Sequence, residues 1–272
     1  MRRPHWRTVS GMIAAGLATH TVCLAADPPP ADPPPADPPS AGRRSSYAIM
    51  APETRAMQDD DTANPGMLSV LDGAALWTAK AGKSNSACSD CHQAAEQSMA
   101  GVAARYPAFD ARRGAAVNLE GRIDACRTEQ QQAPALGHES QDMLALTAYI
   151  GRQSRGLPIV SDQARLASTI AAGRTIYERR QGQLNLSCAQ CHDDNAGQKL
   201  AGITIPEAHP TGYPLYRLEW QSLGSLQRRL RNCLSGMRAE SYPFGAPELV
   251  ALETFLMWRA RGLALETPAV RP

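Results

Sequence analysis

The sequence predicts a mainly α-helical protein made of two tandem copies of one domain. The motif C-x-x-C-H occurs twice, 100 residues apart, and a glycine with an aromatic residue four positions later precedes each motif at the same offset. Each copy ends in a similar helical segment, ALTAYIGRQSRGL or ALETFLMWRARGL. Self-similarity at a fixed period indicates a duplicated structural unit. The matched elements are the motifs at 88–92 and 188–192, the pairs Gly73/Trp77 and Gly173/Tyr177, and the segments 145–157 and 251–263.

The first 46 residues are expected to lie outside the folded domains. Residues 1–26 contain three arginines, then an apolar stretch and a small-residue ending, which is the pattern of a secretory signal peptide. Residues 27–46 begin with eight prolines in thirteen positions and predict an extended, semi-rigid linker. The folded part should begin near Tyr47 or at the helix that follows Asn64-Pro65.

Charge and hydropathy exclude two classes of function. The formal net charge is +2, and it falls to about −1 without the three arginines of the signal, so no basic surface for nucleic acid is expected. No apolar run after the signal approaches the ~20 residues that a membrane-spanning helix needs. The mature protein is therefore expected to be periplasmic, without a membrane span.

The cysteines indicate covalently bound haem. Of seven cysteines, one leaves with the signal and four belong to the two C-x-x-C-H motifs. This motif is typical of c-type haem attachment, in which both cysteines form thioethers and the histidine is the proximal iron ligand. A structural zinc site is the alternative, which export and the repetition of the motif disfavour. The predicted attachment residues are Cys88, Cys91, Cys188 and Cys191, and the predicted proximal ligands are His92 and His192.

Each copy should fold as helix, haem motif, loop, helix, loop and terminal helix, with a first domain at 47–160 and a second at 161–272. Apolar residues of each terminal helix share one face. The glycine in each glycine–aromatic pair removes a side chain, so another helix can approach closely. This arrangement is similar to the class I cytochrome c family, whose first and last helices cross at such a pair. The apolar faces comprise Leu144, Leu146, Tyr149 and Ile150, and Leu249, Leu252, Phe255 and Leu256.

The distal iron ligands decide the function. Two cysteines remain outside the motifs, Cys126 and Cys233, and they occupy equivalent positions at an offset of 107 residues. They are the only candidates matched in both copies, so we predict His/Cys ligation of both haems. Met237 and His138 remain the alternatives, while His209 lies in a segment that only the second copy has. A disulfide between the two cysteines is a further alternative.

The helix around Cys233 is basic. It carries four arginines in eleven residues, and Arg229 lies one helical turn before Cys233 and on the same face. A guanidinium there would stabilise a thiolate and bind an oxyanion through bidentate hydrogen bonds. The other three arginines are also consistent with a solvated helix face, and the helix around Cys126 has balanced charge. These three are Arg228, Arg231 and Arg238.

The two motifs, the matched cysteines and the Arg-x-x-x-Cys element together resemble the SoxA family, the dihaem subunits of SoxAX cytochromes of thiosulfate oxidation. The resemblance implies an L-cysteine S-thiosulfotransferase with two covalently bound haem c groups. It implies Cys233 as the catalytic residue, Arg229 as a substrate contact and, less directly because the alignment is offset, Arg259 as a second one. The implied partners are thiosulfate, a SoxX-like monohaem cytochrome, a SoxYZ-like carrier protein and a small cytochrome c as electron acceptor.

Two other functions remain open from the sequence. A dihaem thiosulfate dehydrogenase would couple two thiosulfates to tetrathionate without a carrier protein, but such enzymes usually place the Cys-ligated haem in the first domain. A non-enzymatic dihaem electron-transfer cytochrome would use Met237 as an iron ligand, because a thioether raises the reduction potential.

Overall fold

The computed structural model describes residues 42–272, which belong to one compact unit. The predicted signal at 1–26 and most of the predicted linker at 27–46 lie outside these residues. The first element is the short 3-10 helix η1 (Ser46–Ile49), followed by α1 (Pro52–Asp59), close to the predicted start of the folded part. Among residues 42–272 no helix is long and apolar enough to cross a membrane.

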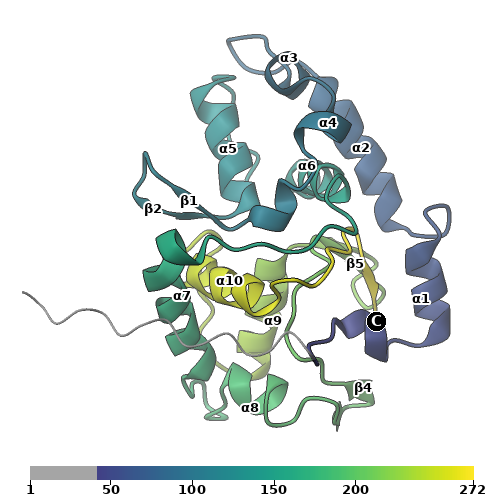
Figure 1. The fold of residues 1–272 in the computed structure, drawn as a ribbon, viewed down its shortest axis with the longest axis vertical. Coiled ribbons are helices and arrows are strands. Elements are labelled where there is room, and N and C mark those ends of the chain that lie inside the picture. Colours follow the sequence, from purple (N-terminus) through teal and green to yellow (C-terminus); the bar gives the residue numbers. More distant parts are fainter. Residues whose placement is uncertain (1–41) are drawn as a thin grey trace, which may run out of the picture. The chain divides into compact units, whose positions relative to one another are not determined.

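The two copies have the same order of helices, as the repeat predicts (Figure 1). In the first copy a long helix precedes the haem motif, and two more follow it. The second copy repeats this order. The first-copy helices are α2 (Gly66–Thr78), α3 (Cys88–His92), α4 (Ala95–Ser98), η2 (Ala103–Arg105), α5 (Leu119–Glu129) and α6 (Gln141–Arg152). The second-copy helices are α7 (Gln163–Glu178), α8 (Cys188–His192), α9 (Leu226–Gly236) and α10 (Pro247–Arg259).

In each copy the first and last long helices cross at a glycine. The helix α2 packs on α6, and α7 packs on α10. A Cβ atom at Gly73 would collide with the carbonyl oxygen of Ala145, and one at Gly173 with that of Ala251. The missing side chain therefore lets the backbones touch. The predicted mainly α fold with two cytochrome c-like helix pairs is confirmed.

Short strands add a hairpin to each copy. Strand β1 (Ala108–Asp110) pairs antiparallel with β2 (Ala115–Val117), and β5 (Leu215–Arg217) pairs in the same way with β6 (Ser222–Gly224). These two hairpins are equivalent at an offset of 107 residues. Two further elements occur in the second copy alone. They are the hairpin of β3 (Lys199–Leu200) and β4 (Ile203–Thr204), and the strand β7 (Val270–Arg271), which pairs parallel with β5.

The two copies exchange their hairpins. Phe109 and Ala116 of the first hairpin pack on the core of the second copy, around α7 and α10. Their equivalents Tyr216 and Leu223 pack on the core of the first copy, around α2 and α6. Each copy thus completes the hydrophobic core of the other, as equivalent surfaces do in a symmetric dimer.

A small cavity of about 60 Å³ lies where the copies meet. Equivalent residues line it from both sides, including Tyr106 and Tyr213. Two carboxyl groups also line it, the half-buried Glu120 of α5 and the buried Glu253 of α10. Burial and the nearby charge of Glu139 raise the pKa of Glu120 to about 7. Burial and the charge of Glu120 likewise raise the pKa of Glu253.

Candidate functional site

The second haem motif forms the short helix α8, which begins at Cys188 because Ser187 caps it. The Ser187 hydroxyl accepts a hydrogen bond from the backbone of Gln190, and the Gln190 side chain accepts one from the backbone of Ser187. At the end of the helix, the Nδ1 atom of His192 donates to the carbonyl of Pro206 at 2.7 Å. This bond fixes the ring and leaves Nε2 as a metal-binding atom.

Cys233 and His192 both line a cavity of about 350 Å³. The helix α9 brings Cys233 there, starting at its cap Ser225, whose hydroxyl accepts from the backbone of Arg228 at 3.1 Å. His192 reaches the Cys233 thiol with a hydrogen bond. Burial raises the pKa of Cys233, but this bond and the charges of Arg229 and Arg217 outweigh burial and lower it overall.

The cavity has the features that a covalently attached haem requires. His192 and Cys233 both line it, and an imidazole and a thiolate are groups that would hold haem iron. Leucines line it on α9 and α10, which suits the apolar faces of a porphyrin. The attachment residues Cys188 and Cys191 lie in α8 with their thiols free of disulfides. The apolar lining includes Leu226, Leu230 and Leu256.

The predicted alternatives to the cysteines are Met237 and His209 for this haem and His138 for the first. Met237 is buried, but it is absent from the cavity wall, and its carbonyl packs against Gly182. His138 stacks on Phe244, with the ring centroids 6.1 Å apart. His209 does line the cavity, where its Nδ1 atom hydrogen-bonds the carbonyl of Arg44 at 2.7 Å.

Three arginines line the cavity beside Cys233, and only Arg229 was expected from the sequence. Arg217 comes from β5 and pairs with Glu219 at 2.8 Å. Arg271 comes from β7 and bonds Gln58, Ser46 and Glu266. Within residues 42–272 the guanidinium of Arg229 forms no ion pair or hydrogen bond. It is therefore a half-buried cation without a partner beside the cysteine.

The other arginines of α9 lie outside the cavity wall. Arg228 covers the ring of Trp220 at 4.2 Å, and Arg231 covers that of Phe244 at 4.5 Å. Arg238 is exposed after the end of the helix. The solvated-face interpretation therefore describes Arg238, while Arg228 and Arg231 are packed on aromatic rings.

The first haem motif, α3, has a different charge environment. The ring of His92 lies 5.8 Å from that of Trp77. Arg122, one turn before Cys126, lies 3.2 Å from the buried carboxylate of Asp110. Burial raises the pKa of Cys126, and the charge of Arg122 only partly offsets this. The arginine beside the first cysteine is thus neutralised.

The repeat shows which residues cause the difference in charge between the two sites. Asp110 in β1 is equivalent to Arg217 in β5, and Arg122 is equivalent to Arg229, both at an offset of 107. An acid that neutralises the arginine in the first copy is replaced by a second cation in the second. The offset of 107 residues also matches Arg217 to Asp110, so the sequence does contain a signal for Arg217. The strands around both residues are short and show little periodicity, which hides this match.

Arg259 does not line the cavity that contains Arg229 and Cys233. Its guanidinium instead pairs with Asp193, with Nη2 and Oδ1 2.6 Å apart. The structure thus places Arg259 outside this cavity wall, and its substrate contact stays a prediction from the resemblance. Arg259 is the last residue of α10, where an alignment error of one residue turns the expected side-chain direction by about 100°.

Comparisons with known proteins agree with this fold. The SoxA/TsdA cytochrome c domain family matches residues 72–159 and 172–265. The L-cysteine S-thiosulfotransferase subunit SoxA of Pseudaminobacter salicylatoxidans is 38% identical over 84% of this chain and 80% of that protein. The same subunit of Rhodovulum sulfidophilum is 36% identical over the same shares.

A solved structure shows the same fold. A chain of the SoxXA crystal structure from P. pantotrophus matches with a TM-score of 0.82 and 33% identity, covering 85% of this chain and 87% of that chain. Family, fold and the two haem motifs all agree, so both motifs carry covalently bound haem c. This chain belongs to the SoxA/TsdA cytochrome c domain family.

Proposed function

We propose that this chain is the dihaem subunit of an L-cysteine S-thiosulfotransferase, which joins thiosulfate oxidatively to a cysteine thiol of a SoxYZ-like carrier protein. One observation carries the proposal above all. Among the residues that the structure describes, the cation Arg229 beside Cys233 has no ion-pair or hydrogen-bond partner, and Arg217 stands where the first copy has the neutralising acid Asp110.

The charge pattern suits a small dianion at the second haem and not at the first. Arg229 and Arg217 offer planar guanidinium groups, which bind oxyanions with two parallel hydrogen bonds. Each such charge-assisted bond contributes about 1.5–3 kcal/mol. Arg217 shares its charge with Glu219, which is 63% exposed, so Arg229 is the principal anchor.

The reaction removes two electrons as one S–S bond forms. The carrier thiol and thiosulfate combine to an S-thiosulfonate, and one proton and two electrons are released. Bound haem c takes up such electrons one at a time. Within this chain, Arg229 would hold thiosulfate beside Cys233, and the S–S bond to the carrier sulfur would form there as the thiol loses its proton and the two electrons pass to the haem. We therefore place the catalytic role on Cys233 and the substrate contact on Arg229.

The proposed haem ligands follow the two motifs. Residues 47–160 carry the first haem through Cys88 and Cys91, with His92 and Cys126 on its iron. Residues 161–272 carry the second haem. Its thioethers would form at Cys188 and Cys191, and His192 and Cys233 would hold its iron.

The proposed reaction also needs partner proteins in the same compartment. A SoxX-like monohaem cytochrome forms a heterodimer with it, in line with its similarity to a chain of a SoxXA crystal structure. A small cytochrome c removes the electrons. The signal-like segment at 1–26 places the protein in the periplasm, where c-type haem is attached and where the carrier would meet it.

The decisive experiment replaces the two matched cysteines one at a time. In the complex with its monohaem partner, Cys233→Ser should abolish conjugation of thiosulfate to the carrier, while Cys126→Ser should retain most of it. Intact mass must show that both haems remain attached in each variant. Turnover retained by Cys233→Ser would contradict the proposal.

The same assay separates the two other functions. Tetrathionate formed without carrier would indicate a thiosulfate dehydrogenase, and the absence of any sulfur product would indicate an electron carrier. The first outcome is disfavoured because the cationic site lies in the second copy, opposite to the usual arrangement of those enzymes. The second is disfavoured because Met237 does not line the cavity.

A further inference from the structure

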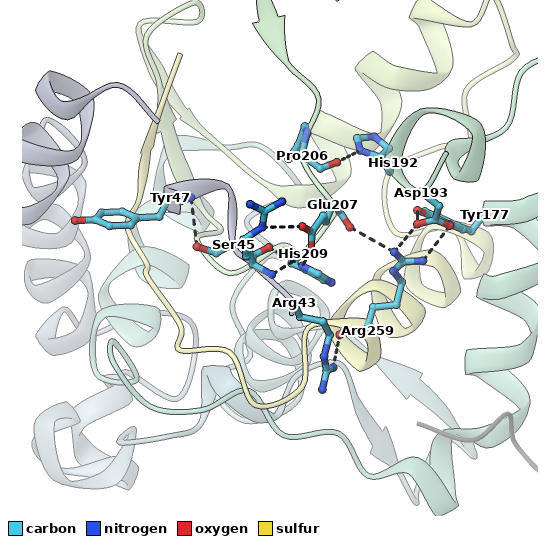
Figure 2. Close-up of polar contacts among 11 residues, drawn as sticks. Arg43, Ser45, Tyr47, Tyr177, His192, Asp193, Pro206, Glu207, His209 and Arg259 are labelled. Carbon is cyan, nitrogen blue, oxygen red and sulfur yellow. Dashed lines mark hydrogen bonds and ion pairs between the residues drawn. The ribbon is translucent and has the colours of Figure 1, made fainter. Parts of the chain in front are cut away.

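A charged network surrounds the proximal side of the second haem site (Figure 2). Its centre is Arg259, whose Nη2 and Nη1 atoms lie 2.6 and 3.3 Å from the two carboxylate oxygens of Asp193. Asp193 is the residue directly after the proximal His192. Tyr177 also donates to Asp193, at 2.9 Å. The end of α8 is thus held by α7 and α10 together.

The same guanidinium holds the segment that fixes the His192 ring. Nη2 of Arg259 donates to the carbonyl of Glu207 at 3.4 Å. Glu207 follows Pro206, whose carbonyl accepts the bond from His192. On its other side the carboxylate of Glu207 pairs with Arg44 at 3.1 Å. The acceptor of the histidine bond is therefore held from two directions (Figure 2).

Arg259 is itself packed so that it has little freedom. Its guanidinium covers the ring of Tyr177 at 4.8 Å and lies 5.8 Å from that of Phe255. Its side chain is only 20% exposed. Its carbonyl accepts a hydrogen bond from Arg43 at 2.6 Å. A bidentate ion pair with both stacking and low exposure is one of the few surface pairs expected to hold a fixed geometry.

The first copy has no counterpart to this network. The residues equivalent to Arg259 and Asp193 are Gln153 and Gln93. Gln153 bonds the carbonyl of Tyr149, and the carbonyl of Gln93 accepts from Trp77. Among the described residues no group accepts a hydrogen bond from the ring of His92. The charges therefore belong to the second haem alone.

We propose that Arg259 is a positioning residue for the second haem, which acts through Asp193 and Glu207 to orient His192 and to set the reduction potential of that haem. The proposal rests on the proposed function only in taking His192 as an iron ligand. It does not depend on thiosulfate being the substrate. Partners of a ligating histidine commonly tune a metal in this way.

The test gives the second copy the residues of the first. R259Q and D193Q remove opposite charges, and R259Q/D193Q restores the balance. In the haem-loaded complex, R259Q should lower the potential of the second haem, because loss of a cation disfavours the reduced state. D193Q should raise it, and the double variant should return close to wild type. A redox titration monitored by EPR measures the potential of each haem. The variant Cys126→Met shifts the EPR signal of the first haem, so the two signals can be told apart.

The matched control is R174Q. Arg174 also pairs with a carboxylate, Glu178, at 2.7 Å on α7, but it contacts nothing near His192. R174Q should change neither potential, although it removes the same charge. If R259Q fails to retain its haem, R259K can replace it. Lysine keeps the charge but cannot form the bidentate ion pair with Asp193, so we expect a change in the EPR signal between none and that expected for R259Q.

Kinetics distinguish this role from a substrate contact. A positioning residue should leave the KM for thiosulfate nearly unchanged while the potential moves. An R259Q variant with a raised KM and unaltered potential and EPR signal would overturn the proposal. That result would contradict the positioning role of Arg259 but not the proposed thiosulfate reaction. Conversely, the effects of R217D and Cys233→Ser on conjugation test the reaction and not the role of Arg259.

Discussion

The guanidinium of Arg122 lies 3.2 Å from the buried carboxylate of Asp110. In the second copy the same two positions are Arg229 and Arg217, and both line the cavity of Cys233. One charge reversal thus converts a neutral structural pair into a cationic site. The duplicated domain keeps one copy for each arrangement, which separates the proposed site of chemistry from the first haem.

Restoring the acid should remove substrate binding. In R217D the new carboxylate would pair with Arg229, as Asp110 pairs with Arg122. We expect kcat/KM for thiosulfate to fall about 10- to 100-fold, which corresponds to the loss of one or two charge-assisted contacts. Steady-state conjugation assays measure this.

The control for R217D is R238Q, which removes an exposed arginine after the end of α9. It should have no effect on kcat/KM. Both variants need two attached haems by intact mass. An unchanged kcat/KM in R217D would show that the arginine site does not bind the substrate.

Iron ligation should follow the cysteines and not Met237. Met237→Leu should leave the near-infrared charge-transfer bands of the ferric protein unchanged, because Met237 lies outside the cavity wall. Cys233→Met should replace the thiolate band of one haem by a thioether band. A thiolate spectrum that survives Cys233→Met at both haems would contradict the assignment.

The carboxyl pair between the copies should make stability depend on pH. Because burial raises the pKa of Glu120 to about 7, the folded state binds a proton more tightly than the unfolded state. Stability is then full below the unfolded pKa near 4.5 and falls as the pH rises to about 7, by about 3 kcal/mol. Melting temperatures from circular dichroism between pH 4.5 and 8 would show this decline.

Glu253→Gln should flatten that profile, because an amide cannot ionise and the pair loses its mutual repulsion. Its melting temperature should exceed that of wild type at pH 8 and approach it at pH 5. Glu129→Gln, an exposed carboxylate paired with Arg113, is the control and should keep the wild-type profile. Equal destabilisation by Glu253→Gln at both pH values would contradict the carboxyl pair.

The helix crossings should not tolerate a methyl group. Gly73→Ala and Gly173→Ala each force a Cβ atom into a backbone carbonyl of the partner helix. We expect each to cost about 1–3 kcal/mol or more, as overpacking does, measured as a lower melting temperature. Gly236→Ala has open space and a helical backbone, so it should be neutral or slightly stabilising. Tolerance of Gly73→Ala would mean that α2 can shift away from α6.

Much of the fold follows from local patterns in the chain. The C-x-x-C-H motifs, the glycines of the crossings and the periodic terminal helices all act within a few residues or one helix turn, so the sequence predicts them. The hairpin exchange is different. Phe109 and Tyr216 look like ordinary core residues, and nothing in their own segments says that each belongs to the core of the other copy.

The residues of the site also divide into those that local sequence predicts and those that only tertiary packing places. The sequence by itself determined the haem attachment residues, the matched Cys126 and Cys233, and Arg229 on the face of Cys233, because covalent motifs, repeat register and helix geometry are short-range. Tertiary structure decided that Arg217 joins Arg229 and that Arg259 turns to Asp193. These contacts join segments far apart in the chain, and only packing fixes where a side chain at the end of a strand or helix points.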